Sequence, residues 1–230
     1  MLLPAARALA IPASALLAAF AHAAPADTGA GARIAAAGLP PAVPACASCH
    51  GARGEGMAAF PHLAGTGADY LREQLESFAA GKRSNPVMQP IAQALTAQQR
   101  ADVAAHYASL APVATSATDG EARNSSDLGP WLATRGRWPD GIPACAQCHG
   151  PGGVGVGASF PPLAGQPAAY IAAQLKAWQG GSRPPGPLGL MESIARKLTE
   201  ADIQAVSNHY AGIAAAPART AGPAPKKVAQ

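Results

Sequence analysis

The six-residue stretch CASCHG at residues 46–51 decides the fold, because it returns as CAQCHG at residues 145–150. All four cysteines of the 230-residue chain lie in these two stretches. The match continues downstream, where FPHLAG at 60–65 parallels FPPLAG at 160–165. A single long repeat of this kind indicates tandem duplication of a whole domain, whereas solenoid proteins repeat every roughly 20 to 50 residues.

The duplication predicts two domains, at residues 24–113 and 120–216, joined by a linker at 114–119. Residues 1–23 have the pattern of a signal peptide, because one cation precedes an apolar run that ends in small residues. Residues 217–230 contain three prolines and no apolar periodicity, which is typical of a disordered tail. We therefore expect a periplasmic protein that is soluble once the leader is removed.

The spacing of apolar residues predicts helices and no strands. Apolar side chains recur at three- and four-residue steps between Ala68 and Ala80, and Gly81 follows as a natural helix stop. A second helix is expected from just after Thr96, a residue suited to the N-cap, to about Leu110. The same pattern returns in the second half, so we expect an all-α fold with long Gly- and Pro-rich loops.

The spacing of the cysteines points to covalent haem attachment. On one helical turn, Cys46, Cys49 and His50 lie on the same face and can address one flat ligand. Two thiols can form thioethers with the two vinyl groups of haem, and the histidine then points at the iron. The matching residues of the second half are Cys145, Cys148 and His149. We therefore expect two haem c groups.

Three other uses of the cysteines compete with this interpretation. In an oxidising compartment, four cysteines could form two disulfides. A thioredoxin-like redox pair expects a βαβ setting, for which the sequence gives no sign. A zinc site shared by all four cysteines would leave the repeated histidine without a role.

A sixth iron ligand is expected from the opposite side of each haem. Met88 and Met191 are the candidates, since soft thioether sulfur favours the ferrous state. The alternative is that each methionine merely fills a gap in the core. His106 and His209 also repeat, but each adjoins an aromatic residue on the last helix. We expect these two histidines to make surface or inter-helix contacts.

Two further pairs of repeated features could support the ligands. A ligating imidazole generally donates its other N–H to an acceptor, and the Pro-x-Leu-Ala-Gly loops are well placed to provide one. Arg83 and Arg183 follow a helix-ending glycine in each half and could pair with haem propionates. The alternative for both arginines is a solvated position in a loop.

Together these residues resemble class I c-type cytochromes, and specifically their dihaem, two-domain cytochrome c4 type. The resemblance is carried by both attachment motifs, by FPHLAG and FPPLAG, by YLREQL and YIAAQL, by GKR and GSR, and by the single methionine before each last helix. It implies that Pro61 and Pro161 offer their carbonyls to the proximal histidines. It also implies two domains packed face to face, which carry electrons between respiratory complexes or dehydrogenases and terminal oxidases.

The expected function is that of an electron carrier and not of an enzyme. Alternatives are a dihaem peroxidase, which needs one open iron, and an electron-accepting subunit of a dehydrogenase complex. The expected partners are redox proteins, with membrane contact at most peripheral. Nucleic acid is excluded, because residues 24–113 carry six Lys/Arg against six Asp/Glu and residues 114–216 carry seven against seven.

Overall fold

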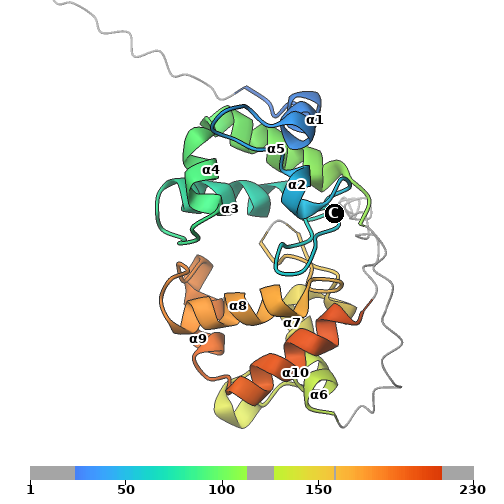
Figure 1. The fold of residues 1–230 in the computed structure, drawn as a ribbon. Helices are drawn as coiled ribbons and strands as arrows, with labels where there is room; N and C mark the ends of the chain where they lie inside the picture. Colours follow the sequence, from blue (N-terminus) through green and yellow to red (C-terminus); the bar gives the residue numbers. More distant parts are fainter. Residues whose placement is uncertain (1–23, 113–126, 158, 214–230) are drawn as a thin grey trace, which may run out of the picture.

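The computed structural model describes residues 24–112, 127–157 and 159–213. Within these ranges the chain forms helices, loops and four isolated β-bridges, with no extended strand. Two similar helical units lie one above the other, with the first half of the chain uppermost (Figure 1). The all-α prediction is confirmed. The predicted signal peptide, linker and tail lie outside the described residues, and the domain boundaries stay predictions.

Within the described residues, each half contains five α-helices in the same order. In the first half these are α1 (Thr28–Ala37), α2 (Ala47–His50), α3 (Ala68–Ala79), α4 (Met88–Ala94) and α5 (Ala97–Ser109). In the second half they are α6 (Leu128–Thr134), α7 (Ala146–His149), α8 (Ala168–Gln179), α9 (Leu190–Ala195) and α10 (Glu200–Ala211). The second half also has short 3-10 helices, η1 (Trp138–Asp140), η2 (Pro151–Gly153) and η3 (Pro187–Gly189). No helix in the described ranges is long and apolar enough to cross a membrane.

The last helix of each half begins with a capping box. The Thr96 hydroxyl accepts a hydrogen bond from the Gln99 backbone N–H at 3.2 Å, and the Gln99 side chain accepts one from the Thr96 N–H at 2.8 Å. Thr199 and Asp202 repeat this arrangement at the start of α10. Each box satisfies N–H groups that have no partner inside the helix. The predicted cap at Thr96 is therefore confirmed.

The first and last helices of each half cross in close contact at a glycine. A Cβ atom added to Gly31 of α1 would lie 2.1 Å from the Asp102 carbonyl oxygen of α5. A Cβ atom added to Gly129 of α6 would lie 2.5 Å from the Ala205 carbonyl oxygen of α10. Only glycine permits the two helices to approach this closely at the crossing. The crossing fixes the positions of the first and last helices relative to each other in each half.

Each half has its own hydrophobic core between these helices. The core of the first half consists of Ile34, Ala35, Val43, Leu71, Leu95, Val103, Ala104 and Tyr107. The core of the second half consists of Leu132, Ala133, Ile142, Ile171, Leu175, Ala195, Leu198, Ile203, Val206 and Tyr210. Several side chains of both cores also line a cavity that the two halves share.

Candidate haem-binding site

The two Cys-x-x-Cys-His motifs each form a single helical turn. The turn of α2 follows Cys46 directly and ends at Gly51, whose φ of 83° places it in a backbone region that favours glycine. Gly150 ends α7 in the same way, with a φ of 78°. All four cysteines are free and half-buried. The described residues contain no cluster of three or more His, Cys, Asp or Glu side chains that could hold a metal ion, so the four-cysteine zinc site does not form.

Each motif histidine is buried and held in one orientation by a proline carbonyl. The Nδ1 of His50 lies 2.9 Å from the Pro61 oxygen, and the Nδ1 of His149 lies 2.8 Å from the Pro161 oxygen. Burial lowers the pKa of both histidines below the ordinary value, and the hydrogen bond opposes this effect only in part. A neutral imidazole that donates from Nδ1 leaves Nε2 as the free lone pair, which is the form that binds a metal.

A phenylalanine stands edge-on to each of these imidazoles. The ring centroids of His50 and Phe60 are 6.1 Å apart at an interplanar angle of 73°, and those of His149 and Phe160 are 6.1 Å apart at 83°. Edge-to-face packing restricts rotation of both rings. The FP dipeptides of the two repeated loops therefore provide a ring contact and a carbonyl acceptor for the same histidine.

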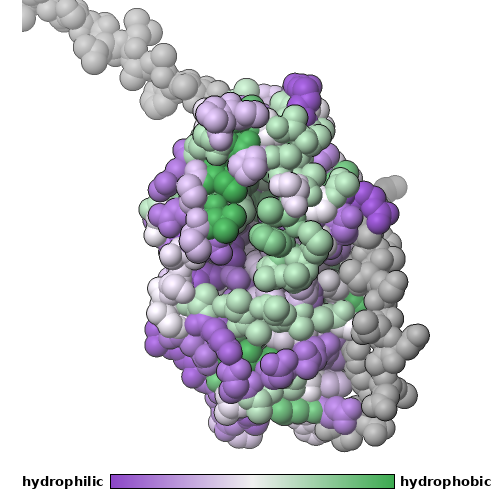
Figure 2. All heavy atoms as spheres, in the orientation of Figure 1, coloured by the Kyte–Doolittle hydropathy of each residue, from purple (hydrophilic) through white to green (hydrophobic). Residues whose placement is uncertain are grey.

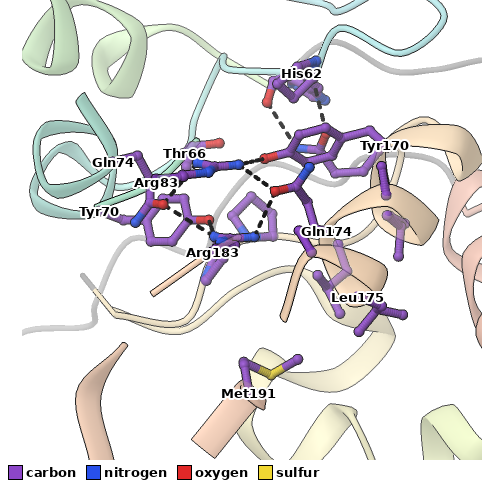
Figure 3. Close-up of a pocket in the computed structure, with 18 of the residues that line it drawn as sticks. His62, Thr66, Tyr70, Gln74, Arg83, Tyr170, Gln174, Leu175, Arg183 and Met191 are labelled. Atoms are coloured by element: carbon purple, nitrogen blue, oxygen red, sulfur yellow. Dashed lines mark hydrogen bonds between the residues drawn. The ribbon is translucent and has the colours of Figure 1, made fainter. Parts of the chain in front are cut away.

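One cavity of about 580 Å³ runs through both halves and joins the two candidate sites. The first half lines it with His50 and Met88, and the second half lines it with His149 and Met191. Figure 3 shows Met191 in this cavity. Most of the other lining side chains are apolar. A neutral imidazole and a thioether in each half, set in a mostly apolar lining, are the donor types that hold haem iron. Seven other predicted site residues also line it: Cys46, Cys145, Cys148, Pro61, Pro161 and the arginine pair described next.

Arg83 and Arg183 are buried, each only 6% exposed, so the solvated-loop alternative is wrong. Each guanidinium stacks on an aromatic ring of its own half: Arg83 lies 4.4 Å from the Phe78 centroid, and Arg183 lies 3.8 Å from the Trp178 centroid. A stacked guanidinium has a fixed plane. The predicted contact with haem propionates stays a prediction.

The arginines also cross from one half to the other (Figure 3). Arg83 donates to the Tyr170 hydroxyl at 3.2 Å and to the Gln174 side-chain oxygen at 2.5 Å. Arg183 donates to the Tyr70 hydroxyl at 2.8 Å and, at 3.2 Å, to the side-chain oxygen of a glutamine of the first half. Sequence analysis did not identify these acceptors, although the YLREQL and YIAAQL repeat contains all four of them.

Both guanidiniums bond the same two glutamine oxygens, so their charges lie close together. The Nη1 of Arg83 lies 2.9 Å from the Gln74 side-chain oxygen, and the Nη2 of Arg183 lies 3.2 Å from the same oxygen. These two nitrogens are therefore at most about 6 Å apart. At an effective dielectric constant of about 20, two unit charges at this separation repel by about 3 kcal/mol. Burial alone would raise the pKa of Tyr170, but the two guanidiniums outweigh it and hold that pKa below the ordinary value.

A second polar contact joins the two halves. The His62 backbone N–H donates to the Gln166 side-chain oxygen at 3.1 Å, and the Gln166 amide donates to the His62 carbonyl at 2.8 Å. Both residues are buried. The counterpart of His62 in the repeat is Pro162, and nothing in the local sequence marks a contact with the other half.

The repeated histidines of the last helices lie at helix crossings. His106 of α5 packs where α1 crosses, with its Cβ 2.8 Å from a Cβ added to Gly31. His209 of α10 has the same place beside Gly129, at 3.0 Å. These positions match the expected inter-helix contact.

Large apolar side chains reach solvent in both halves. Met57 is 56% exposed and its counterpart Val156 is 51% exposed. Val87, 46% exposed, precedes Met88, and Leu188, 92% exposed, lies three residues before Met191. On the face shown in Figure 2, apolar side chains gather on the upper half beside a hollow. Apolar surface is therefore available near both candidate haem sites.

Comparison with known proteins identifies both halves as c-type domains. Residues 30–111 match the family model for cytochrome c, and residues 142–209 match that for the cbb3-type cytochrome c oxidase subunit III. A thiosulfate dehydrogenase electron acceptor from Stutzerimonas stutzeri is 49% identical over 76% of this chain and 82% of its own length. A cytochrome c4 from Pseudomonas aeruginosa is 40% identical over 73% of this chain and 83% of its own.

Two solved structures share the fold. Cytochrome c4 from Pseudomonas stutzeri has a TM-score of 0.70 and 34% identity, and the match covers 82% of this chain and 99% of that chain. Thiosulfate dehydrogenase (TsdBA) from Marichromatium purpuratum has a TM-score of 0.71 and 43% identity over 80% of this chain. The present chain spans only 40% of that longer protein. Two c-type domains with intact attachment motifs carry two covalently bound haem c groups, and the chain belongs to the dihaem c-type cytochromes of the cytochrome c4 type, which transfer electrons and are not themselves enzymes.

Proposed function

We propose that this cytochrome works in the periplasm as the electron acceptor of a dehydrogenase, and that a thiosulfate dehydrogenase is its donor. The observation that carries the proposal is the 49% identity to a relative described as an acceptor for that enzyme, against 40% to a relative described as cytochrome c4. A match to part of a thiosulfate dehydrogenase chain at 43% identity points the same way. Export by residues 1–23 is supported by their charge and apolar pattern.

The ligand assignment is part of this proposal. Cys46 and Cys49 would hold the first haem through thioethers, with His50 and Met88 as its axial ligands. Their counterparts in the second half are Cys145, Cys148, His149 and Met191. When bound, haem supplies the one-electron couple that the polypeptide itself lacks.

The chain's own residues make these sites rigid and dry. The hydrogen bonds from His50 to Pro61 and from His149 to Pro161 support a fixed imidazole in each half. The apolar lining of the cavity excludes water, which lowers the cost of reorganisation when the charge changes. An iron that kept both its histidine and its methionine ligand would have no open position, which favours electron transfer over the peroxidase alternative.

The test is reduction of the purified cytochrome by a thiosulfate dehydrogenase with thiosulfate, followed at the haem absorption bands. Rapid reduction of both haems that depends on both enzyme and thiosulfate would support the proposed donor. A dehydrogenase that turns over with an artificial acceptor but leaves this cytochrome oxidised would refute it.

A further inference from the structure

Two buried tyrosine hydroxyls have no hydrogen-bond partner among the described residues. They belong to Tyr107 of α5 and Tyr210 of α10, and each of these residues is only 2% exposed. Because buried polar groups are nearly always hydrogen-bonded, an unpaired hydroxyl at the same place in both halves needs an explanation. Both tyrosines line the cavity of the candidate haem sites. An acceptor that is present only in the loaded protein would explain both hydroxyls.

The ring of each tyrosine is fixed by the loop that follows an attachment motif. A Cβ atom added to Gly54 would lie 2.8 Å from the Tyr107 ring, and one added to Gly153 would lie 2.5 Å from the Tyr210 ring. The backbone carbonyl of each tyrosine also accepts a hydrogen bond from the glycine that ends the repeated Leu-Ala-Gly loop, at 2.9 Å in the first half and 3.0 Å in the second. Each hydroxyl therefore has a defined position.

These hydroxyls lie beside the first cysteine of each motif. Cys46 packs against the core that contains Tyr107. Cys145 packs against the core that contains Tyr210. Burial raises the pKa of each thiol, and the adjacent tyrosine hydroxyl opposes this effect in part. Burial also raises the pKa of both tyrosines, and the thiol beside each adds to the effect. Both hydroxyls therefore keep their proton at neutral pH and remain hydrogen-bond donors.

Haem attachment changes what these sulfur atoms can do. A free thiol can donate a hydrogen bond as well as accept one; the Cys145 thiol donates to the Leu132 carbonyl at 3.7 Å. Thioether formation adds the sulfur to one carbon of a vinyl group and the thiol hydrogen to the other. The sulfur then has lone pairs but no hydrogen, and a thioether can only accept. In the loaded protein a tyrosine hydroxyl can therefore meet this sulfur only as the donor.

We propose that Tyr107 donates a hydrogen bond to the thioether sulfur of Cys46. Tyr210 donates the same bond to the thioether sulfur of Cys145. The inference rests on the proposed attachment of haem at these two cysteines. Each tyrosine is then a positioning residue, which holds the sulfur in one orientation and withdraws electron density from it. Because the reduced haem is richer in electrons, each bond raises the reduction potential of its own half.

The experiment is resonance Raman spectroscopy of the haem-loaded protein, read at the carbon–sulfur stretching band. Tyr107→Phe and Tyr210→Phe each remove one oxygen and keep the ring that packs in the core. Each variant should shift the carbon–sulfur band of one haem and leave that of the other unchanged. In wild type equilibrated with D₂O, replacement of O–H by O–D should shift the band, and each variant should lose about half of this isotope shift.

The matched control is Tyr70→Phe. It removes the same atom from a hydroxyl that already has a partner, since the Tyr70 hydroxyl accepts a hydrogen bond from Arg183 at 2.8 Å. Both the carbon–sulfur band and its isotope shift should stay as in wild type.

A spectroelectrochemical titration of the same variants provides a second measurement. Tyr107→Phe should lower the potential of the first half only, and Tyr210→Phe that of the second half only. An equal fall of both potentials in either variant would refute a hydrogen bond confined to one sulfur.

The spectra can also overturn the inference directly. An unchanged carbon–sulfur band with an undiminished isotope shift in both Phe variants would refute it, and so would a shift of the same size in Tyr70→Phe. Extraction of wild type with acidified solvent tests the attachment separately, because haem released from the polypeptide would refute the attachment itself. Wild-type protein that shows covalent haem and the isotope shift, but that thiosulfate dehydrogenase cannot reduce, would refute the proposed donor alone.

Discussion

The ion pair between Arg137 and Asp202 should make the second half sensitive to acid. Arg137 donates to both carboxylate oxygens of Asp202 at 2.9 Å, and the Asp202 side chain is only 3% exposed. Hydrogen bonding to Arg137 lowers the pKa of Asp202 from 3.8 to about 2. Because one pKa unit corresponds to about 1.36 kcal/mol, the carboxylate contributes about 2 kcal/mol to the free energy of unfolding at neutral pH.

The direction of the pH effect follows from the lowered pKa. Asp202 stabilises the fold at pH values above its ordinary value of 3.8, and this contribution is lost as the pH falls from there through about 2. The substitution Arg137→Leu should remove most of this contribution to the free energy of unfolding. Leucine is a suitable replacement because Leu39 forms the matching β-bridge in the first half.

The assay is chemical unfolding of wild type, Arg137→Leu, Asp202→Asn and the double variant between pH 7 and pH 2. The coupling energy between the two positions should be about 2 kcal/mol at pH 7 and should shrink toward pH 2. Asp102→Asn is the control, since Asp102 is buried at the matching place but accepts only from the Asp27 N–H and the Gln98 amide. A coupling energy near zero at pH 7, or one that grows with acid, would refute the reasoning.

Three further predictions concern the ligands, the helix crossing and docking. Met88→Ala and Met191→Ala should each remove about half of the methionine-to-ferric-iron charge-transfer band and open one haem to carbon monoxide; an unchanged spectrum would contradict the ligand assignment. Gly31→Ala should lower the free energy of unfolding by about 3 kcal/mol, because its Cβ meets a backbone oxygen at 2.1 Å, whereas Gly180→Ala, where the nearest atom is 3.4 Å away, should cost much less. Electron transfer with the partner should vary weakly with ionic strength, because residues 24–113 and residues 114–216 each have equal numbers of acidic and basic residues; a steep salt dependence in protein that lacks residues 217–230 would show that charge on the domains steers docking.

The sequence predicted those features whose signals are local. Thr96 and Gly81 mark helix ends, because caps depend on a few neighbouring residues. The attachment motifs could be interpreted because two thiols and one imidazole must be spaced in this way along the chain to reach a single ligand.

Contacts between the halves could not be predicted in the same way. Arg83 and Tyr170 are 87 positions apart in the chain, and no local pattern links them. The repeat showed that an arginine, a tyrosine and a glutamine recur, yet it did not show that each arginine crosses to the opposite unit. The sequence alone was therefore also compatible with a solvated loop position for both arginines.

The contact between His62 of the first half and Gln166 of the second half has no counterpart with the two positions exchanged. At the corresponding positions the second half has Pro162, which has no backbone N–H to donate, and the first half has Thr66, whose buried hydroxyl has no hydrogen-bond partner among the described residues. Two first halves facing each other would lack the amide, and two second halves would lack the N–H donor. This contact can therefore form only between unlike halves, which favours pairing of a first half with a second half over association of like halves.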